Sequence, residues 1–251
     1  MQLKLAGKKA IITGSSRGIG RAIAVALHKE GCRVVLNGRT AADVSLAASE
    51  LSGAIGIVGD VTRPNEAHRI INEATTALDG IDILICNVGS GRSVPPGKET
   101  LEEWQRVFEI NLWSTTNMVE AAREALSLSQ GVVICISSIC GLEVVPGAPV
   151  TYSAAKAALH AYVRGIAEPL GEQGIRINAI AAGNVIFEDS VWSRKMTEDA
   201  IAVRQMLDRD VALGRLGDPQ EIANLATYLA SPLSGFATGG VWKLDGGQTR
   251  C

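Results

Sequence analysis

Short apolar segments alternate with helix-like segments along the whole chain, and this alternation constrains the fold most. Each apolar segment has the length and composition of a buried strand, and the segments between are long enough for a helix. Seven such alternations predict one α/β domain over residues 1–251, a Rossmann-type doubly wound parallel sheet with helices on both faces and right-handed crossovers. The strands are predicted at Lys9–Thr13, Arg33–Asn37, Ala54–Val58, Ile81–Cys86, Gly131–Ile136, Gly174–Ile180 and Val241–Leu244.

The clearest helices begin at recognisable N-terminal signals. They are predicted from Pro64 to about Leu78, from Thr100 towards Leu128, after Tyr152, and from Pro219 to about Ala230. Thr100 and Glu103 have capping-box spacing, and Asp218, Pro219 and Glu221 have the pattern of an N-cap, a first-position proline and an acid at the third position. Residues 187–214 are mixed in polarity, and they are interpreted either as a lid over a pocket or as a surface excursion.

Charge and composition exclude several function classes. The net charge of −2 gives no reason to expect a nucleic-acid partner or an anionic membrane surface, and no apolar run has membrane-spanning length. The first residues show no signal-peptide layout, and the five cysteines lack CxxC spacing, so we expect a reducing cytoplasm. His28, His68 and His160 are scattered, so no metal site is expected.

A glycine-rich turn follows the first predicted strand. Gly14, Gly18 and Gly20 have GxxxGxG spacing, and helical periodicity starts immediately afterwards. Glycines allow a tight turn and a close backbone approach, and the N-terminus of a helix offers free N–H groups to a phosphate. The turn, which also contains Ser16, Arg17 and Ile19, is therefore predicted to bind a nucleotide.

The end of the second strand bears on the choice of cofactor. An acid here would favour the free ribose of NAD, but the sequence has Gly38 followed by Arg39. Together with Arg17, Arg39 could grip a 2′-phosphate, which favours NADP(H). The alternative is a pair of surface arginines.

Other strand ends carry further candidate residues. Asp60, followed by Val61, is interpreted as an adenine contact or a turn residue, while Asn87 and Gly89 lie where ligands bind in open sheets. Asn111 stands mid-helix among apolar residues, where a hydrogen-bonding role and simple exposure are equally compatible with the sequence. Gly183 and Val185, which follow the sixth strand, are predicted to bind the cofactor, as are Tyr152 and Lys156.

The segment Ser137–Lys156 carries candidate proton-transfer chemistry. Tyr152 and Lys156 are four residues apart on a predicted helix, so their side chains share one face. A nearby ammonium lowers a phenol's pKa, and a serine hydroxyl can bind an oxygen on which charge develops. Taken by itself, this spacing arises easily by chance.

Together these motifs resemble the short-chain dehydrogenase/reductase family over essentially the whole chain. The matching residues, in the family's order, are Thr13-Gly14-x-x-x-Gly18-x-Gly20, Asp60-Val61, Asn87-x-Gly89, Asn111, Ser138 and Tyr152-x-x-x-Lys156. The resemblance implies that Tyr152 is the general acid in reduction, that Lys156 lowers its pKa and holds the nicotinamide ribose, that Ser138 binds the substrate oxygen, and that Asn111 holds a water linking Lys156 to solvent. It also implies strand order 3-2-1-4-5-6-7 and a homotetramer or homodimer.

The sequence departs from the family's pattern at residues that the resemblance places near the nicotinamide end of the site. Ala182 stands where members often have proline, Phe187 where they often have threonine, and Val88 where alanine is usual. The predicted function is NADP(H)-dependent interconversion of a ketone and a secondary alcohol, with a 3-oxoacyl thioester as one candidate substrate. The alternatives are a sugar or polyol dehydrogenase and a nucleotide-binding protein with little turnover. Arg92, Arg194 and Lys195 are candidates for contacting an anionic substrate or are solvated surface charges.

Overall fold

The computed structural model describes residues 2–250, and its centre is one seven-stranded parallel sheet. The strand order is β3-β2-β1-β4-β5-β6-β7, as the resemblance implied. The strands are β1 (Lys9–Ile12), β2 (Arg33–Gly38), β3 (Ile55–Val58), β4 (Ile83–Cys86), β5 (Val132–Ser138), β6 (Arg176–Ala182) and β7 (Val241–Leu244). β5 and β6 are the longest and pair over seven residues each, so the centre of the sheet rigidly supports Ser138 at the end of β5.

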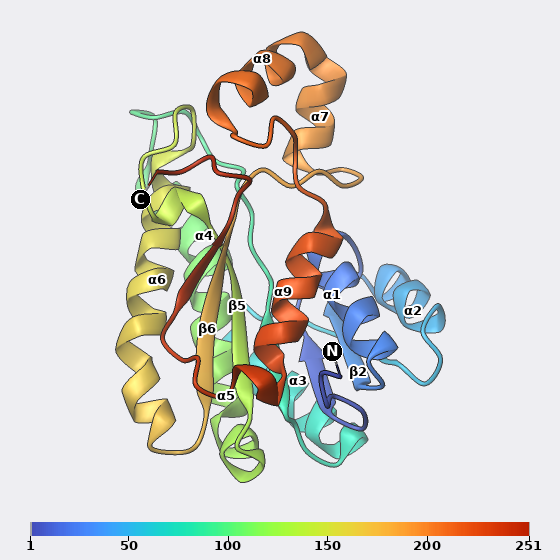
Figure 1. Cartoon of the computed structure of the whole chain (residues 1–251). Helices are drawn as coiled ribbons and strands as arrows, with labels where there is room; N and C mark the ends of the chain where they lie inside the picture. The colour runs from blue at the N-terminus through green and yellow to red at the C-terminus, as the bar shows by residue number, and fades with distance from the viewer. Residues whose placement is uncertain (1, 251) are drawn as a thin grey trace.

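Helices cover both faces of this sheet (Figure 1). They are α1 (Gly18–Lys29), α2 (Ala41–Ser49), α3 (Pro64–Leu78), α4 (Leu101–Phe108), α5 (Ser114–Ser129), α6 (Val150–Gly171), α7 (Val191–Glu198), α8 (Ala200–Asp210) and α9 (Pro219–Ala230), with short helical turns η1 (Glu109–Trp113), η2 (Ile139–Gly141) and η3 (Pro232–Ser234). α1 and α9 pack together on one face, and α3, α5 and α6 contribute to the core on the other.

The two faces have separate apolar cores, as the period of two along each strand requires. On β5, Ile134 and Ile136 pack in the core beneath α1 and α9, whereas Val133 and Cys135 pack in the core beneath α3, α5 and α6. All seven residues of β5 are buried. The continuous apolar pattern of this strand is therefore explained by helices on both sides.

Two segments differ from the sequence predictions. Helix α2 was not predicted, and the expected continuous helix from Thr100 towards Leu128 is interrupted by the π-helical turn η1. The segment 187–214 forms two helices, α7 and α8, which lie beyond the carboxyl ends of the strands at the top of Figure 1. The lid role of this segment stays a prediction.

The two helix-start signals are resolved differently. α9 has a full capping box, with Asp218 and Glu221 bonding each other's backbone groups. At α4, Thr100 accepts from the backbone N–H of Glu103, but the Glu103 carboxylate accepts instead from Arg106 and Ser93. The expected reciprocal bond is therefore replaced by a link to the loop that precedes α4.

Candidate active site

The glycine turn between β1 and α1 is held by Asn87 from the end of β4. Its Nδ2 donates to the carbonyl oxygens of Thr13 and Gly14 at 3.0 and 2.9 Å. A Cβ on Gly20 would lie 2.5 Å from that same Nδ2, so only glycine allows this approach. Gly14 and Gly18 both have φ of +59°, a conformation that side chains disfavour. Asn87 thus shapes the phosphate turn from the neighbouring strand.

The start of α1 has the properties of an anion site. The N-cap residue makes no side-chain hydrogen bond, so the first N–H groups of the helix have no side-chain acceptor. The first turn contains no acid, so no carboxylate offsets the positive end of the helix dipole. The glycine turn brings backbone within reach of a bound group at the same place. These features fit the diphosphate of a dinucleotide.

Two residues after β6 lie against this turn. The ring of Phe187 would be 2.6 Å from a Cβ on Gly18, so the ring packs directly on the glycine backbone. Arg17 forms an exposed ion pair with Asp189, with Nη1 and Oδ2 3.6 Å apart. Arg39 is exposed at the end of β2. Both arginines were expected to bind a 2′-phosphate. They differ in their availability, because Arg17 already has a carboxylate partner.

Ser138 and Tyr152 meet at the carboxyl end of β5. Ser138 is buried at the last position of the strand, and its Oγ accepts from the N–H of Cys140 at 3.2 Å. Burial raises the pKa of the Tyr152 phenol to about 12, and a hydrogen bond with Ser138 acts in the opposite direction. The phenol is consequently protonated near neutral pH and can donate a proton.

Lys156 lies one helical turn after Tyr152 and is buried. Its Nζ donates to the carbonyl oxygen of Ile136 at 3.1 Å and lies 5.9 Å from the centre of the Tyr152 ring. Burial lowers the pKa of Lys156 to about 8. A Cβ on Gly89 would be only 3.1 Å from Nζ, so the absence of a side chain at Gly89 leaves room for the ammonium.

Asn111 is 1% exposed, which excludes the exposed alternative. It lies in the π-helical turn η1, a geometry common at functional sites. Its Nδ2 donates to the carbonyl oxygens of Ser90 and Val107, both at 3.0 Å, and its Oδ1 accepts from the N–H of Ser90 at 2.9 Å. The side chain therefore fixes the loop after β4 beside Lys156, and the relay water at Asn111 stays a prediction.

The remaining predicted cofactor residues have local structural partners. Asp60 Oδ1 accepts from the N–H and hydroxyl of Thr62, which matches the turn interpretation. The carbonyl of Val61 accepts from Asn117. Gly183 packs against the backbone of Asp245, where a Cβ would be 2.7 Å away, and Val185 bridges to Gly217. Contacts of these residues with a cofactor stay predictions.

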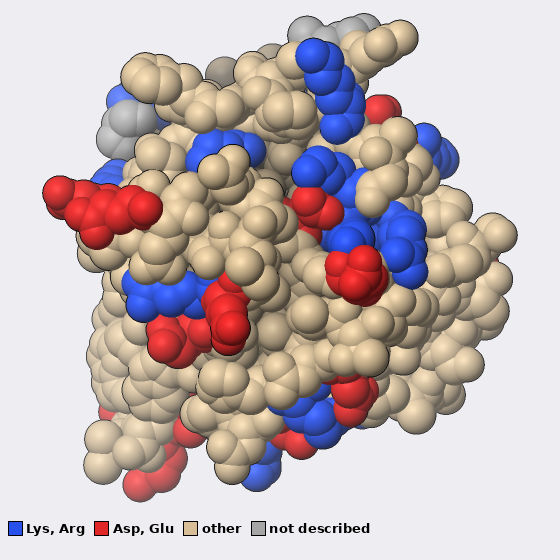
Figure 2. Space-filling model, turned by 90° about the horizontal axis from the view of Figure 1, so that it is seen from below, with Lys and Arg blue, Asp and Glu red and all other residues tan. Residues whose placement is uncertain are grey.

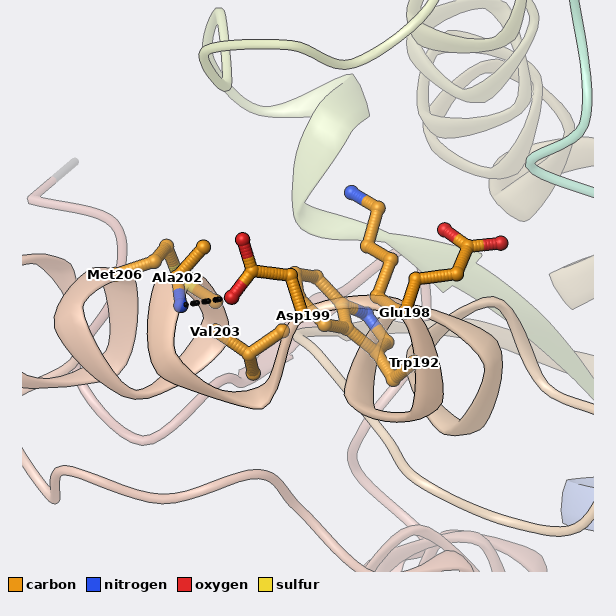
Figure 3. Close-up of a pocket in the computed structure, with 7 residues that line it drawn as sticks. Trp192, Glu198, Asp199, Ala202, Val203 and Met206 are labelled. Carbon is orange, nitrogen blue, oxygen red and sulfur yellow. Dashed lines mark hydrogen bonds between the residues drawn. The ribbon is translucent and has the colours of Figure 1, made fainter.

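The segment 187–214 contains a cavity of about 210 Å³ between α7 and α8. Trp192, Val203 and Met206 supply apolar lining, and Glu198 and Asp199 lie at the same pocket (Figure 3). Asp199 also caps α8 by accepting from the N–H of Ala202 at 2.9 Å. Because two carboxylates share the pocket with Lys195, whose Nζ lies 4.7 Å from the Trp192 ring centre, the net charge there does not favour an anion.

The surface charges are mixed in sign. On the face opposite α7 and α8, basic and acidic side chains lie next to one another (Figure 2). Among residues 2–250, no cluster of three potential His, Cys, Asp or Glu ligands is present. No helix in this part of the chain combines the length and apolarity needed to cross a membrane.

Both the sequence and the fold match known proteins. A family described as "Enoyl-(Acyl carrier protein) reductase" matches residues 14–249. The 3-oxoacyl-[acyl-carrier-protein] reductase of Aquifex aeolicus is 31% identical over 254 residues, covering 99% of this chain and 100% of the relative. The chain belongs to the short-chain dehydrogenase/reductase family. It is accordingly an oxidoreductase acting on CH–OH or carbonyl groups.

Solved structures of the same family share the whole fold. The L-sorbose reductase of Gluconobacter frateurii, complexed with NADPH and L-sorbose, has a TM-score of 0.93 at 27% identity, with both chains fully covered. A 7α-hydroxysteroid dehydrogenase complexed with NADH has a TM-score of 0.91 at 28% identity, covering 100% of this chain and 97% of that one. These two solved structures thus hold different nicotinamide cofactors.

Three polar residues at the site were not predicted. Ser15 holds the turn to β2 by donating its N–H to the Asn37 carbonyl at 2.8 Å. Ser90 is the partner of Asn111. His160 lies two turns after Tyr152 and hydrogen-bonds Ser137. The i, i+4, i+8 spacing of Tyr152, Lys156 and His160 was the available signal for the last of these.

Proposed function

We propose that the protein reduces a ketone to a secondary alcohol with NADPH. The observation that carries this proposal is the meeting of Ser138, Tyr152 and Lys156 at one strand end, beside a turn suited to a phosphate. The glycine turn and the N-terminus of α1 would hold the diphosphate, and Lys156 would hold the nicotinamide ribose. When bound, the nicotinamide would supply the hydride.

The three side chains have distinct roles in this proposal. The Ser138 hydroxyl donates a hydrogen bond to the carbonyl oxygen of the substrate and orients it. Tyr152 delivers its phenolic proton to that oxygen as charge develops there. Lys156, protonated below about pH 8, stabilises the phenolate that remains. In the reverse direction Tyr152 would accept the proton from an alcohol.

The preference for NADPH over NADH rests on the end of β2. The sequence offers Arg39 and no carboxylate at the position where an acid would bind the ribose hydroxyl. Arg39 is exposed and lies next to Gly38, whereas Arg17 is paired with Asp189. Arg39 is therefore the main candidate for binding the 2′-phosphate. Arg17 would bind the same phosphate after its ion pair with Asp189 breaks.

Two substrate classes have support. The Aquifex relative favours a 3-oxoacyl thioester, and the sorbose reductase favours a keto-sugar. The pocket between α7 and α8, with apolar lining and charges of both signs, favours a substrate with an apolar part over one recognised mainly by negative charge. An assembly of two or four copies in the cytoplasm is part of the same proposal.

A substrate screen tests this function. Purified protein is mixed with NADPH or NADH and with simple ketones, 3-oxoacyl thioesters or keto-sugars, and loss of the reduced-nicotinamide absorbance is followed. We expect turnover with at least one carbonyl class and a higher kcat/KM with NADPH. NADPH binding without turnover of any carbonyl would instead support the alternative of a nucleotide-binding protein.

A further inference from the structure

A second polar contact joins α6 to β5, on the opposite side of the strand from Ser138. His160 Nε2 and Ser137 Oγ are 2.7 Å apart, and the two residues are 2% and 5% exposed. Successive side chains on a strand point to opposite faces, so Ser137 points towards the core under α6 while Ser138 faces the proposed site. The pair therefore lies behind the reacting groups and has no direct access to a substrate.

The Ser137–His160 contact lies close to the point where α6 packs against the turn that follows β5. Gly141, just after Ser138, packs against the backbone of Lys156 so closely that a Cβ would lie 2.6 Å from the Lys156 carbonyl carbon. Helix α6 and the turn η2 that follows β5 are thus in direct backbone contact. A small sliding movement of α6 along β5 would change the Tyr152–Ser138 geometry on which the proposed proton transfer depends.

Besides the Tyr152–Ser138 hydrogen bond, two side chains of α6 among the described residues form hydrogen bonds with β5 near this end. Lys156 Nζ donates to the Ile136 carbonyl, and His160 bonds Ser137 one turn later. In the proposed function Lys156 also binds the cofactor and stabilises a phenolate, so its contact with the strand is shared with other tasks. The His160–Ser137 bond has no such second task.

His160 is an unusual choice if it merely fills space. Among residues 2–250, no hydrogen-bond partner of ordinary geometry reaches its buried Nδ1. Burial lowers the pKa of His160 to about 4, although the nearby Gly141 backbone acts in the opposite direction. An aliphatic side chain would fill the same space without burying two polar ring nitrogens. Retaining a neutral imidazole here is explained by the directional bond that Nε2 makes to Ser137.

We propose that the Ser137–His160 hydrogen bond is a positioning contact, which fixes the helix bearing Tyr152 and Lys156 against the strand bearing Ser138. This inference rests on the proposed function, because the position it sets matters only if Tyr152 and Ser138 act on one substrate oxygen. Neither Ser137 nor His160 contacts the reacting atoms, so each acts through its neighbour.

Two single variants and their combination test this role. Ser137→Ala removes the hydroxyl oxygen, and His160→Leu removes the imidazole ring. Each is expected to lower kcat about tenfold, which corresponds to the free energy of roughly one buried hydrogen bond. The dissociation constant for NADPH should change much less than kcat, because the glycine turn that would hold the diphosphate is remote from this contact and only the Lys156 contact would be displaced. The double variant should be no slower than the slower single variant, since both remove the same bond. His160→Gln, which keeps a polar nitrogen at comparable reach, should recover part of kcat.

A matched control separates positioning from general destabilisation. Thr227 is buried in α9 and donates to the Ala223 carbonyl at 2.7 Å, so Thr227→Val also removes a buried hydrogen bond. It should lower the melting temperature without lowering kcat. If His160→Leu does not fold, the smaller Ser137→Ala change still provides the test.

The outcomes separate the two proposals. An active wild-type enzyme whose kcat is unaffected by Ser137→Ala and His160→Leu would overturn the positioning role alone. Additive losses in the double variant would also overturn it, because the residues would then act independently. Absence of wild-type turnover with every carbonyl would overturn the proposed function and, with it, the reason for a positioning contact.

Discussion

Replacing Gly89 by alanine should damage catalysis through Lys156 while leaving the fold intact. The new Cβ would lie 3.1 Å from both Lys156 Nζ and Asn111 Oδ1, whereas ordinary contact begins at 3.4 Å. Each neighbour must therefore retreat by about 0.3 Å. Asn111 is held by three hydrogen bonds, so most of the movement falls on the lysine side chain.

The size of the effect follows from that displacement. A shift of about 1 Å at a catalytic group costs on the order of a hundredfold in rate, so a few tenths of an ångström should cost roughly tenfold in kcat. Steady-state kinetics with NADPH and the best carbonyl from the screen measure this loss, and thermal unfolding reports stability. We expect the melting temperature to change little, because Gly89 has no strained φ that alanine would need to adopt.

A control for this variant is available on the catalytic helix itself. A Cβ on Gly165, within α6, would meet no atom within 4 Å outside the neighbouring backbone of its own helix, so Gly165→Ala adds a methyl group without a new packing contact. It should stabilise the helix by about 0.5–1 kcal/mol and leave kcat unchanged. A Gly89→Ala enzyme with wild-type kcat would refute the reasoning, because Lys156 would then tolerate displacement.

Three further predictions concern pH and the cofactor. Reduction should lose kcat/KM as pH rises through about 8, because burial lowers the pKa of Lys156 and the neutral amine no longer stabilises the phenolate; Lys156→Arg should be slower but lack this alkaline loss. Arg39→Ala should raise the dissociation constant for NADPH about tenfold or more and leave that for NADH unchanged in fluorescence titrations, and equal weakening of both would contradict a 2′-phosphate contact. Phe187→Thr should bind NADPH severalfold more tightly by uncovering Gly18, at some cost in melting temperature; weaker binding would show that the ring itself supports the cofactor.

The sheet could be predicted from the sequence because its strands are buried on both faces. Continuous apolar runs such as Val132–Ile136 are typical of strands covered by helices on each side, and the regular alternation of segments points to the same arrangement. Helix α2 escaped prediction because Ala41–Ser49 is short and buries only Val44 and Ala47, so it shows no clear apolar stripe. The turn η1 escaped because a π-helical insertion shifts the register without interrupting the apolar pattern.

The proposed site was predictable where a residue's spacing reflects its role. Tyr152 and Lys156 share a helix face at any tertiary arrangement, and the glycine turn is local. The sequence could not decide whether Asn111 is exposed, because its burial depends on the loop at Ser90, 21 residues earlier. The contacts of Arg17 with Asp189 and of Ser137 with His160 likewise depend on how distant segments pack, which local patterns do not contain.

Tyr152 is the residue on which the proposed reduction depends most, because its phenol delivers the proton to the carbonyl oxygen. The most direct measurement compares Tyr152→Phe with the wild type in two assays, NADPH binding by fluorescence and single-turnover reduction of the best substrate. Removing one phenolic oxygen should leave NADPH affinity within about twofold and lower the rate of reduction by a factor of about 10² to 10⁴, the usual contribution of a general acid. A Tyr152→Phe enzyme that binds NADPH normally and reduces the carbonyl at close to the wild-type rate would contradict this role.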